Sequence, residues 1–293
     1  MKVRLAIPYA PGDIWAATPF IRDFAEQRPH DTLVLDVACP EILQGNPHAV
    51  ALSGHVREDL DLTFRFAYDR VDEDGCRVYG VADPTSSMRR AFYDFFRYAA
   101  GIEIEERTFA PEFYPDAFER RYSPAPVGRP VCVLNAGSKL DIPVKHWGVD
   151  HYSRVVDALR DRVLFVQVGA ARRGVDNHPR IPGALDLVGK TTLRDLATLV
   201  YHADFVLTGI SQLHHIAGIQ NYKPRHCITV AGAREPMNWA NCYERAGVTW
   251  HWLDARTCKG DLPGCWHSQC RNCPAMASIA PERVIEIFKE VLG

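Results

Sequence analysis

Short aliphatic runs alternate with amphipathic segments along this chain, and the alternation predicts strands joined by helices. Lys2–Ile7 is an aliphatic run typical of a buried parallel strand, and a proline ends it. A helix is expected from about residue 14 to 27, and Thr32–Val37 has the composition of the next strand. The aromatic-rich segment 87–100 predicts an amphipathic helix whose rings pack in a core. A strand, a helix and another strand in this order favour a parallel sheet.

A second series of the same kind begins at about residue 130. Strands are expected at 130–135, 163–169 and 227–231, with a helix at 151–160. A further amphipathic helix precedes the apolar strand Phe205–Leu207, and a polar turn follows that strand. Such a turn between a strand end and a helix N-terminus is where α/β proteins hold phosphates and sugars.

Length and composition favour two domains. The chain has 293 residues, more than one domain usually contains, and the proline-rich, charged segment 108–130 is typical of a linker. We therefore predict an α/β fold of two successive domains with a cleft between them. They span 1–125 and 126–280, the second carries a cysteine-rich segment at 258–273, and a C-terminal helix follows at 281–293.

The net charge and the apolar segments of the sequence argue against three classes: nucleic-acid-binding, secreted and membrane-spanning proteins. A formal net charge of −2 disfavours a protein that grips nucleic acid chiefly through its phosphates, although a local basic patch is compatible with it. The apolar start is too short for a signal peptide. No apolar run approaches the roughly 20 residues that span a bilayer. We expect a cytoplasmic protein without a transmembrane segment.

Nine cysteines fall into two groups. Five are scattered and are expected to be reduced and mostly buried: Cys39, Cys76, Cys132, Cys227 and Cys242. The other four lie close together and could hold a structural zinc or iron ion: Cys258, Cys265, Cys270 and Cys273. Their spacing is not that of a standard zinc ribbon, so free or redox-sensitive thiols stay an alternative, and His267 is a substitute ligand.

One aspartate stands out at the start of the first predicted helix. Asp13 follows Gly12 at the carboxyl end of the first strand, the edge where open α/β sheets bind ligands. The same position suits a helix N-cap, a role that aspartate fills readily. The spacing alone leaves both interpretations open.

Several stretches of the chain resemble a known family. Residues 188–218, and the Gly-Asp-Ile-Trp-Ala-Ala-Thr-Pro-Phe-Ile-Arg segment that begins at Gly12, are similar to the ADP-heptose:lipopolysaccharide heptosyltransferases, which are GT-B glycosyltransferases. The resemblance implies that Asp13 is the general base that deprotonates an acceptor hydroxyl. It also places Gly12 and Asn46 on the acceptor side, whereas the alternative for the Asn46-Pro segment is a simple turn.

The loop after the first strand of the second series resembles the family's diphosphate-binding loop. Gly137 and Ser138 are small enough to let a phosphate approach the backbone, and Lys145 can neutralise a departing diphosphate. Lysines are more commonly solvated surface charges, so Lys145 depends on the resemblance. The resemblance implies that Gly137, Ser138 and Lys145 contact the donor.

The polar turn at 208–215 resembles the family's donor-sugar loop with two departures. Ser211 and His215 match its hydroxyl and histidine positions, and the resemblance implies that both bind the donor. Ile210 takes the usual acidic position and Gln212 the usual glycine. Because isoleucine cannot hydrogen-bond a sugar hydroxyl, the identity of the donor sugar stays open.

Arg234 and Glu235 follow the strand at 227–231 in a turn that resembles the family's nucleotide-binding turn. The resemblance implies contacts with the phosphate and ribose. A surface ion pair between the two residues is the alternative.

The resemblance implies a GT-B fold with two Rossmann-like domains, of which the N-terminal one binds the acceptor and the C-terminal one the nucleotide sugar. It also implies an inverting, metal-independent glycosyltransferase that needs no catalytic cofactor. Its donor would be a nucleoside diphosphate sugar, with ADP and a heptose favoured, and its acceptor a glycan of the lipopolysaccharide type. Two alternatives stay open: transfer to a modified nucleic acid or a protein, and a non-catalytic relative that binds sugar nucleotides.

Overall fold

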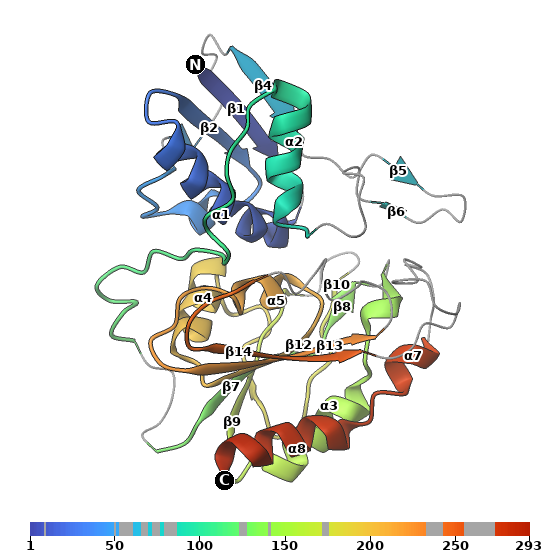
Figure 1. Cartoon of the computed structure of the whole chain (residues 1–293). Coiled ribbons are helices and arrows are strands. Elements are labelled where there is room, and N and C mark those ends of the chain that lie inside the picture. Colours follow the sequence, from blue (N-terminus) through green and yellow to red (C-terminus); the bar gives the residue numbers. More distant parts are fainter. Residues whose placement is uncertain are drawn as a thin grey trace. The chain divides into compact units, whose positions relative to one another are not determined.

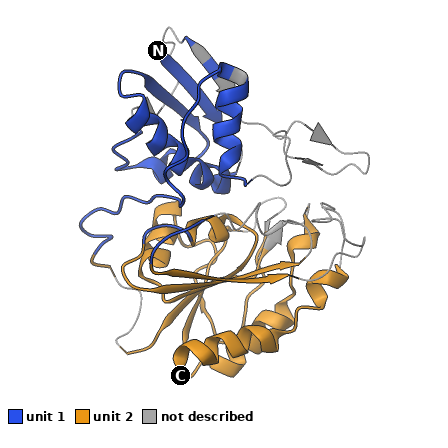
Figure 2. Ribbon diagram, viewed as in Figure 1, with its two compact units in different colours: residues 1–120, 218–220, 237–246 blue, residues 121–217, 221–236, 247–293 orange. Residues whose placement is uncertain are grey.

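The structure is a computed structural model of the whole chain, and it describes residues 1–8, 10–49, 51–52, 61–65, 70–71, 77–78, 87–122, 128–139, 142–171, 176–232, 243–254 and 273–293. The chain forms two compact units (Figure 2). Unit 1 comprises Met1–Arg120, Gly218–Gln220 and Met237–Ala246, and unit 2 comprises the remaining segments Arg121–Ala217, Asn221–Pro236 and Gly247–Gly293.

Unit 1 is built on a parallel sheet of four strands in the order β3-β2-β1-β4 (Figure 1). The strands are β1 (Lys2–Ile7), β2 (Thr32–Val37), β3 (Ala51–Leu52) and β4 (Leu62–Arg65). Two short strands, β5 (Arg70–Val71) and β6 (Arg77–Val78), pair antiparallel with each other. The helices are α1 (Pro11–Gln27), the 3-10 turn η1 (Pro40–Leu43) and α2 (Arg90–Ala100).

An aromatic core joins α1 to α2. The ring centroids of Phe20 and Phe96 lie 4.5 Å apart, and those of Phe24 and Phe96 lie 5.9 Å apart. Tyr93 meets Phe20 edge to face. Aromatic pairs at these separations add to the stability that their burial provides. The prediction that the aromatic residues of α2 pack in a core is confirmed for Phe92, Tyr93 and Phe96, whereas Tyr98 is 80% exposed.

The chain after α2 is bound tightly to α1. Asp23 is fully buried and accepts four hydrogen bonds: from the Tyr93 hydroxyl, from the backbone N–H groups of Arg107 and Thr108, and from the Thr108 hydroxyl. Farther along, the Glu112 backbone N–H donates to the Thr18 hydroxyl. The first part of the segment that the composition suggested as a linker therefore belongs to the body of unit 1.

Unit 2 is built on a parallel sheet of six strands in the order β11-β9-β7-β12-β13-β14. The strands are β7 (Val131–Asn135), β9 (Leu164–Gln167), β11 (Leu185–Asp186), β12 (Phe205–Gly209), β13 (Arg225–Gly232) and β14 (Val248–Asp254). This is the strand order of a dinucleotide-binding fold, whose direction of winding reverses between β7 and β12. A small antiparallel pair, β8 (Ser138–Lys139) with β10 (Asp176–Asn177), lies beyond β7.

Helices cover both faces of the unit 2 sheet. On one face lie α3 (Val149–Leu159) and α8 (Pro281–Leu292), and on the other lie α4 (Leu193–His202) and α5 (Gln212–Ile216) (Figure 1). The turns η2 (Pro143–Lys145) and α7 (Pro274–Ala277) complete the unit. The predicted α/β class with parallel sheets is confirmed. No helix in the described segments combines the length and hydropathy needed to cross a bilayer.

Candidate active site

Asp13 lies in the first turn of α1, directly after the carboxyl end of β1. Ala10 is the N-cap, Pro11 takes the first helical position, and no side chain caps this end. The Asp13 backbone N–H donates to the Ala10 carbonyl oxygen at 3.0 Å. The alternative that Asp13 is the N-cap is therefore wrong. Asp13 is 3% exposed and Gly12 beside it is buried, and the helix dipole favours a negative charge in this turn.

Asn46 forms a turn in unit 1, after η1. Its backbone N–H donates to the Leu43 carbonyl, and its Oδ1 accepts from the His48 backbone N–H at 2.9 Å. Asn46 is 8% exposed, and its Nδ2 atom has no hydrogen-bond partner among the described residues. The turn interpretation is thus correct, and the role of Asn46 on the acceptor side stays a prediction.

In unit 2, two neighbouring strands end where the winding of the sheet reverses. Strand β7 ends at Asn135 and β12 ends at Gly209. Asn135 of β7 pairs in register with Thr208 of β12. The Gly137 backbone N–H donates to Asn135 Oδ1 at 2.9 Å, which closes a tight turn after β7. Ser138 follows as the first residue of β8, and its side chain lies outside the described part. The two loops form the edge where such sheets bind nucleotides.

Lys145 lies beside the end of β12. It ends the short turn η2, and a methyl group on Gly209 would lie 3.1 Å from the Lys145 carbonyl oxygen. The Lys145 ammonium is also close enough to His215 to lower the pKa of that imidazole. The structure thus brings together Lys145 and His215, which lie 70 positions apart in the sequence.

Adjacent histidines on α5 differ in their surroundings. His214 is fully buried, its Nδ1 lies 2.9 Å from the Thr229 hydroxyl, and its ring packs on Trp250. Those contacts make His214 a structural residue. His215 is 6% exposed, and burial above all, with His214 and Lys145 adding to it, holds the pKa of His215 well below its usual value. His215 is therefore a neutral imidazole near pH 7.

The turn into α5 is organised by hydroxyl groups. Ser211 is the N-cap of α5, its Oγ accepts from the Leu213 backbone N–H at 3.2 Å, and the Thr208 hydroxyl lies 3.0 Å from Ser211 Oγ. Ile210 is buried. The Gln212 Nε2 atom is buried without a hydrogen-bond partner in the described residues.

His178 is a residue that the sequence reasoning missed. Its imidazole occupies the space beside Gly137 and Gly169, at the ends of β7 and β9, where a methyl group on either glycine would overlap the ring. No local motif marks this histidine. The signal is only the pair of glycines at two strand ends, and that pairing becomes informative once the strands are known to be neighbours.

Several predicted residues lie outside the described residues: Arg234, Glu235, Cys258, Cys265 and Cys270. Cys273, the fourth cysteine of the predicted metal site, is buried at the N-cap of α7. Within the described segments, no three potential metal ligands gather. Among the scattered cysteines, Cys132 and Cys227 are buried free thiols, and burial raises the pKa of Cys227 to about 11.

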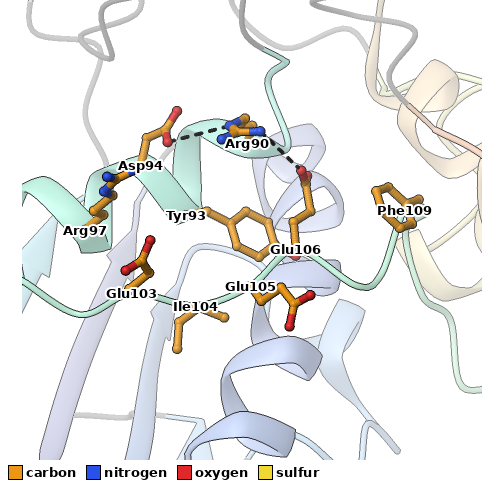
Figure 3. A pocket seen from close by; sticks show the side chains of 9 residues that line it. All are labelled: Arg90, Tyr93, Asp94, Arg97, Glu103, Ile104, Glu105, Glu106 and Phe109. Atoms are coloured by element: carbon orange, nitrogen blue, oxygen red, sulfur yellow. Dashed lines mark ion pairs between the residues drawn. The ribbon is translucent and has the colours of Figure 1, made fainter.

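A cavity of about 430 Å³ lies in unit 1 between α2 and the segment that follows it (Figure 3). Its lining mixes both charges, and Arg90 pairs with Asp94 at 3.7 Å and with Glu106 at 4.0 Å (Figure 3). None of the site residues that the sequence suggested lines it. The cavity is therefore separate from the candidate active-site residues.

Solved structures share this fold at low sequence identity. A family 9 glycosyl transferase from Veillonella parvula superposes with a TM-score of 0.71 at 13% identity, covering 99% of this chain and 97% of that one. ADP-heptose LPS heptosyltransferase II of E. coli gives 0.67 at 14% identity, covering 100% and 98%. The dodecameric iron-containing heptosyltransferase TibC of E. coli, solved with ADP-D-beta-D-heptose, gives 0.67 at 16% identity, covering 99% and 77%. These likenesses confirm the GT-B fold.

The sequence itself matches a family model. No curated protein matches the chain. The model of glycosyltransferase family 9 (heptosyltransferase) matches residues 80–263, more than half of the chain. This match confirms the family resemblance that the motifs suggested. It does not favour the alternatives, which were transfer to a modified nucleic acid or a protein and a non-catalytic role. The chain belongs to glycosyltransferase family 9, the heptosyltransferases, and is a nucleotide-sugar glycosyltransferase.

Proposed function

We propose that this glycosyltransferase moves a heptose-like sugar from ADP to a hydroxyl group of a lipopolysaccharide-type acceptor, with inversion and without a catalytic metal ion. The observation that carries the proposal is the grouping of Lys145, His215 and the Gly137 turn at the reversal point of a nucleotide-binding sheet. The E. coli ADP-heptose LPS heptosyltransferase II supports the choice of donor and acceptor, and TibC, solved with ADP-D-beta-D-heptose, supports the choice of donor.

The proposed chemistry is a single displacement. Asp13 accepts the proton of the acceptor hydroxyl while the oxygen forms a bond to the anomeric carbon, and the bond from that carbon to the diphosphate oxygen breaks. The incoming oxygen attacks the face opposite the leaving group, so the anomeric configuration inverts. Burial of Asp13 in the first turn of α1 supports this role, because it shields a carboxylate that the helix dipole favours.

The leaving group gains negative charge as its bond to the sugar breaks. Lys145, the Ser138 hydroxyl and the backbone N–H groups around Gly137 are the groups that we assign to the departing ADP. A neutral His215 can hydrogen-bond a phosphate or sugar oxygen without adding a second cation beside Lys145. Ser211, Arg234 and Glu235 are assigned to the remaining donor contacts, and Gly12 and Asn46 to the acceptor.

We also propose a structural metal site at the four C-terminal cysteines. A set of four thiolates suits zinc or iron, and Cys273, the member that the structure describes, is buried, as a structural ligand should be. One of the similar structures is an iron-containing enzyme. The site would stabilise the fold, and no catalytic step depends on it. Metal analysis of the purified protein and of Cys273→Ser tests this proposal.

The site of action that we propose is the cytoplasm, where nucleotide sugars are made available to soluble transferases. This proposal extends the sequence-based expectation and depends on the choice of donor. Fractionation of the native host tests it.

A transfer assay with matched donors tests the proposed function. The purified protein is incubated with ADP-, UDP- and GDP-linked sugars and a truncated lipopolysaccharide acceptor, with and without a chelator. We expect transfer from the ADP-linked heptose alone, unchanged by the chelator, and an inverted anomeric configuration in the product by NMR. Transfer from a different nucleotide would overturn the donor assignment, and loss of activity in the chelator would overturn metal-independent catalysis.

A further inference from the structure

His178 occupies a slot that exists because two residues lack side chains. A methyl group on Gly137 would lie 2.6 Å from the Cε1 atom of His178, and one on Gly169 would lie 2.6 Å from its Cγ atom. Carbon atoms in contact are normally 3.5–4.0 Å apart. The imidazole ring therefore packs directly on the backbone at the ends of two neighbouring strands, β7 and β9.

Independent features hold His178 in this slot. The preceding residue, Asn177, pairs with Ser138 in the β8-β10 ribbon. The following residues are held by Gln167, whose side chain is fully buried at the end of β9. The Gln167 Nε2 group donates to the Pro179 carbonyl at 2.6 Å, and its Oε1 accepts from the Ile181 backbone N–H at 2.8 Å. The backbone before the histidine is thus fixed to the β8-β10 ribbon, and the backbone after it is fixed to the end of β9.

We propose that His178 is a positioning residue of the donor site, which holds the Gly137 turn in the conformation that receives the diphosphate. This inference rests on the proposed function, because it assigns the Gly137 turn to the donor. The turn is also closed by the hydrogen bond from the Gly137 N–H to Asn135 Oδ1. Backbone N–H groups stabilise a phosphate well only when their directions are set before the ligand arrives.

Gly137 has no side chain that could pack against a neighbour and fix the turn. The His178 ring fills the space where that side chain would lie and contacts the backbone of the turn. If the ring is removed, the turn gains space on the side of β9. A misplacement of a binding group by about 1 Å can cost up to 10²-fold in catalysis. The effect of removing His178 should therefore appear in donor binding and turnover.

The central experiment is a double-mutant cycle in the full-length protein with ADP as the probe. His178→Ala should weaken ADP binding about tenfold and lower kcat/KM roughly 10- to 100-fold. Gly169→Ala lies outside the donor turn, yet its methyl group should displace the ring and weaken ADP binding to a similar extent. In the double variant the ring is absent, so the methyl group should add less than a twofold effect.

Two further variants separate positioning from general packing. His178→Asn keeps a planar polar group that reaches the position of Nδ1, and its ADP affinity should lie between those of wild type and His178→Ala. His226→Ala is the matched control, because His226 is a partly buried histidine on β13 of the same sheet. Its ADP affinity should equal that of the wild type within twofold.

Hydrogen exchange of the ligand-free protein gives a readout that does not depend on ADP. In His178→Ala, amides in the peptide 133–139 should exchange faster, while those of β13 should not. If the exchange or the ADP affinity is unchanged in His178→Ala, or if the effects of the two substitutions multiply, the inference is overturned while the proposed function stands. If the wild type itself fails to bind ADP, the proposed function fails, and the exchange result alone supports or overturns the positioning of the turn.

Discussion

Two aspartates on α1 show how burial alone leaves the role of a residue undecided. Asp13 and Asp23 are both buried, yet Asp23 accepts four hydrogen bonds that bind the segment after α2. Asp13 instead lies in the first turn, just beyond the carboxyl end of β1, the edge where open α/β sheets bind their ligands. We therefore expect opposite consequences when each carboxylate is replaced, one in chemistry and one in stability.

Asp13→Asn should lower kcat by roughly 10²- to 10⁴-fold, because the amide cannot accept the proton of the acceptor hydroxyl. The affinity for ADP should change little, since the donor contacts are assigned to unit 2. Steady-state kinetics with saturating donor, together with calorimetry for ADP, measure both quantities. Retention of a tenth or more of the wild-type kcat would exclude Asp13 as the general base.

Asp23→Ala should lower the free energy of unfolding by roughly 3 kcal/mol, because it leaves buried donors of Tyr93, Arg107 and Thr108 without their acceptor. Urea denaturation measures the change. Asp94→Ala is the control, since the ion pair of Asp94 among the described residues is a 3.7 Å contact with a largely exposed arginine. A loss within about 0.5 kcal/mol is expected there. Equal losses in the two variants would contradict the structural role of Asp23.

At the scale of elements, the strands and helices with a strong hydrophobic pattern could be predicted from the sequence. Contacts between residues that lie far apart in the sequence could not. Strands β1 and β2 begin and end where the sequence indicated. Strand β14 was missed, because its residues are mostly half-buried at the edge of the sheet and carry no clear alternation. His178 and Asp23 were missed because their partners lie far away in the sequence, and only the fold brings them together.

Strands β13 and β14 carry a pair of histidines whose titration we expect to affect stability. His226 Nδ1 lies 3.1 Å from His251 Nε2, and burial lowers the pKa of both. For His251 the neighbouring His226 lowers the pKa further, and Glu290 opposes this. Below the unfolded-state pKa of about 6.5, the unfolded chain binds more protons than the native protein. Stability should therefore be full above about pH 6.5 and fall as the pH drops below it.

Thermal unfolding between pH 7.5 and 5 checks this prediction. A variant with both His226→Gln and His251→Gln should lose less stability over that range than the wild type. The remaining loss is expected from His146 and His215, whose pKa values are also lowered by burial. An identical pH dependence in the two proteins would show that the histidine pair does not contribute.

At the scale of the whole molecule, the proposed function predicts a link between donor binding and stability. ADP at 100 times its dissociation constant should stabilise the native state by about 2.7 kcal/mol, because it binds only the folded protein. A rise in the thermal midpoint with ADP, and not with equal concentrations of GDP or CMP, is the expected result. Lys145→Met should reduce this rise, whereas Asp13→Asn should keep it. No rise with any nucleotide would argue against the donor site.

The division of the chain into units restricts how this protein could be recombined with its relatives. The chain passes between the two units five times, because Gly218–Gln220 and Met237–Ala246 belong to unit 1 (Figure 2). Gln220 Oε1 accepts from the Phe113 backbone N–H, and the Arg245 guanidinium donates to the Pro111 carbonyl. A chimera made by a single crossover near residue 120 would therefore combine a first half from one parent with anchoring residues from the other. Exchange of acceptor specificity between homologues should succeed only when these two short segments are exchanged together with the first 120 residues.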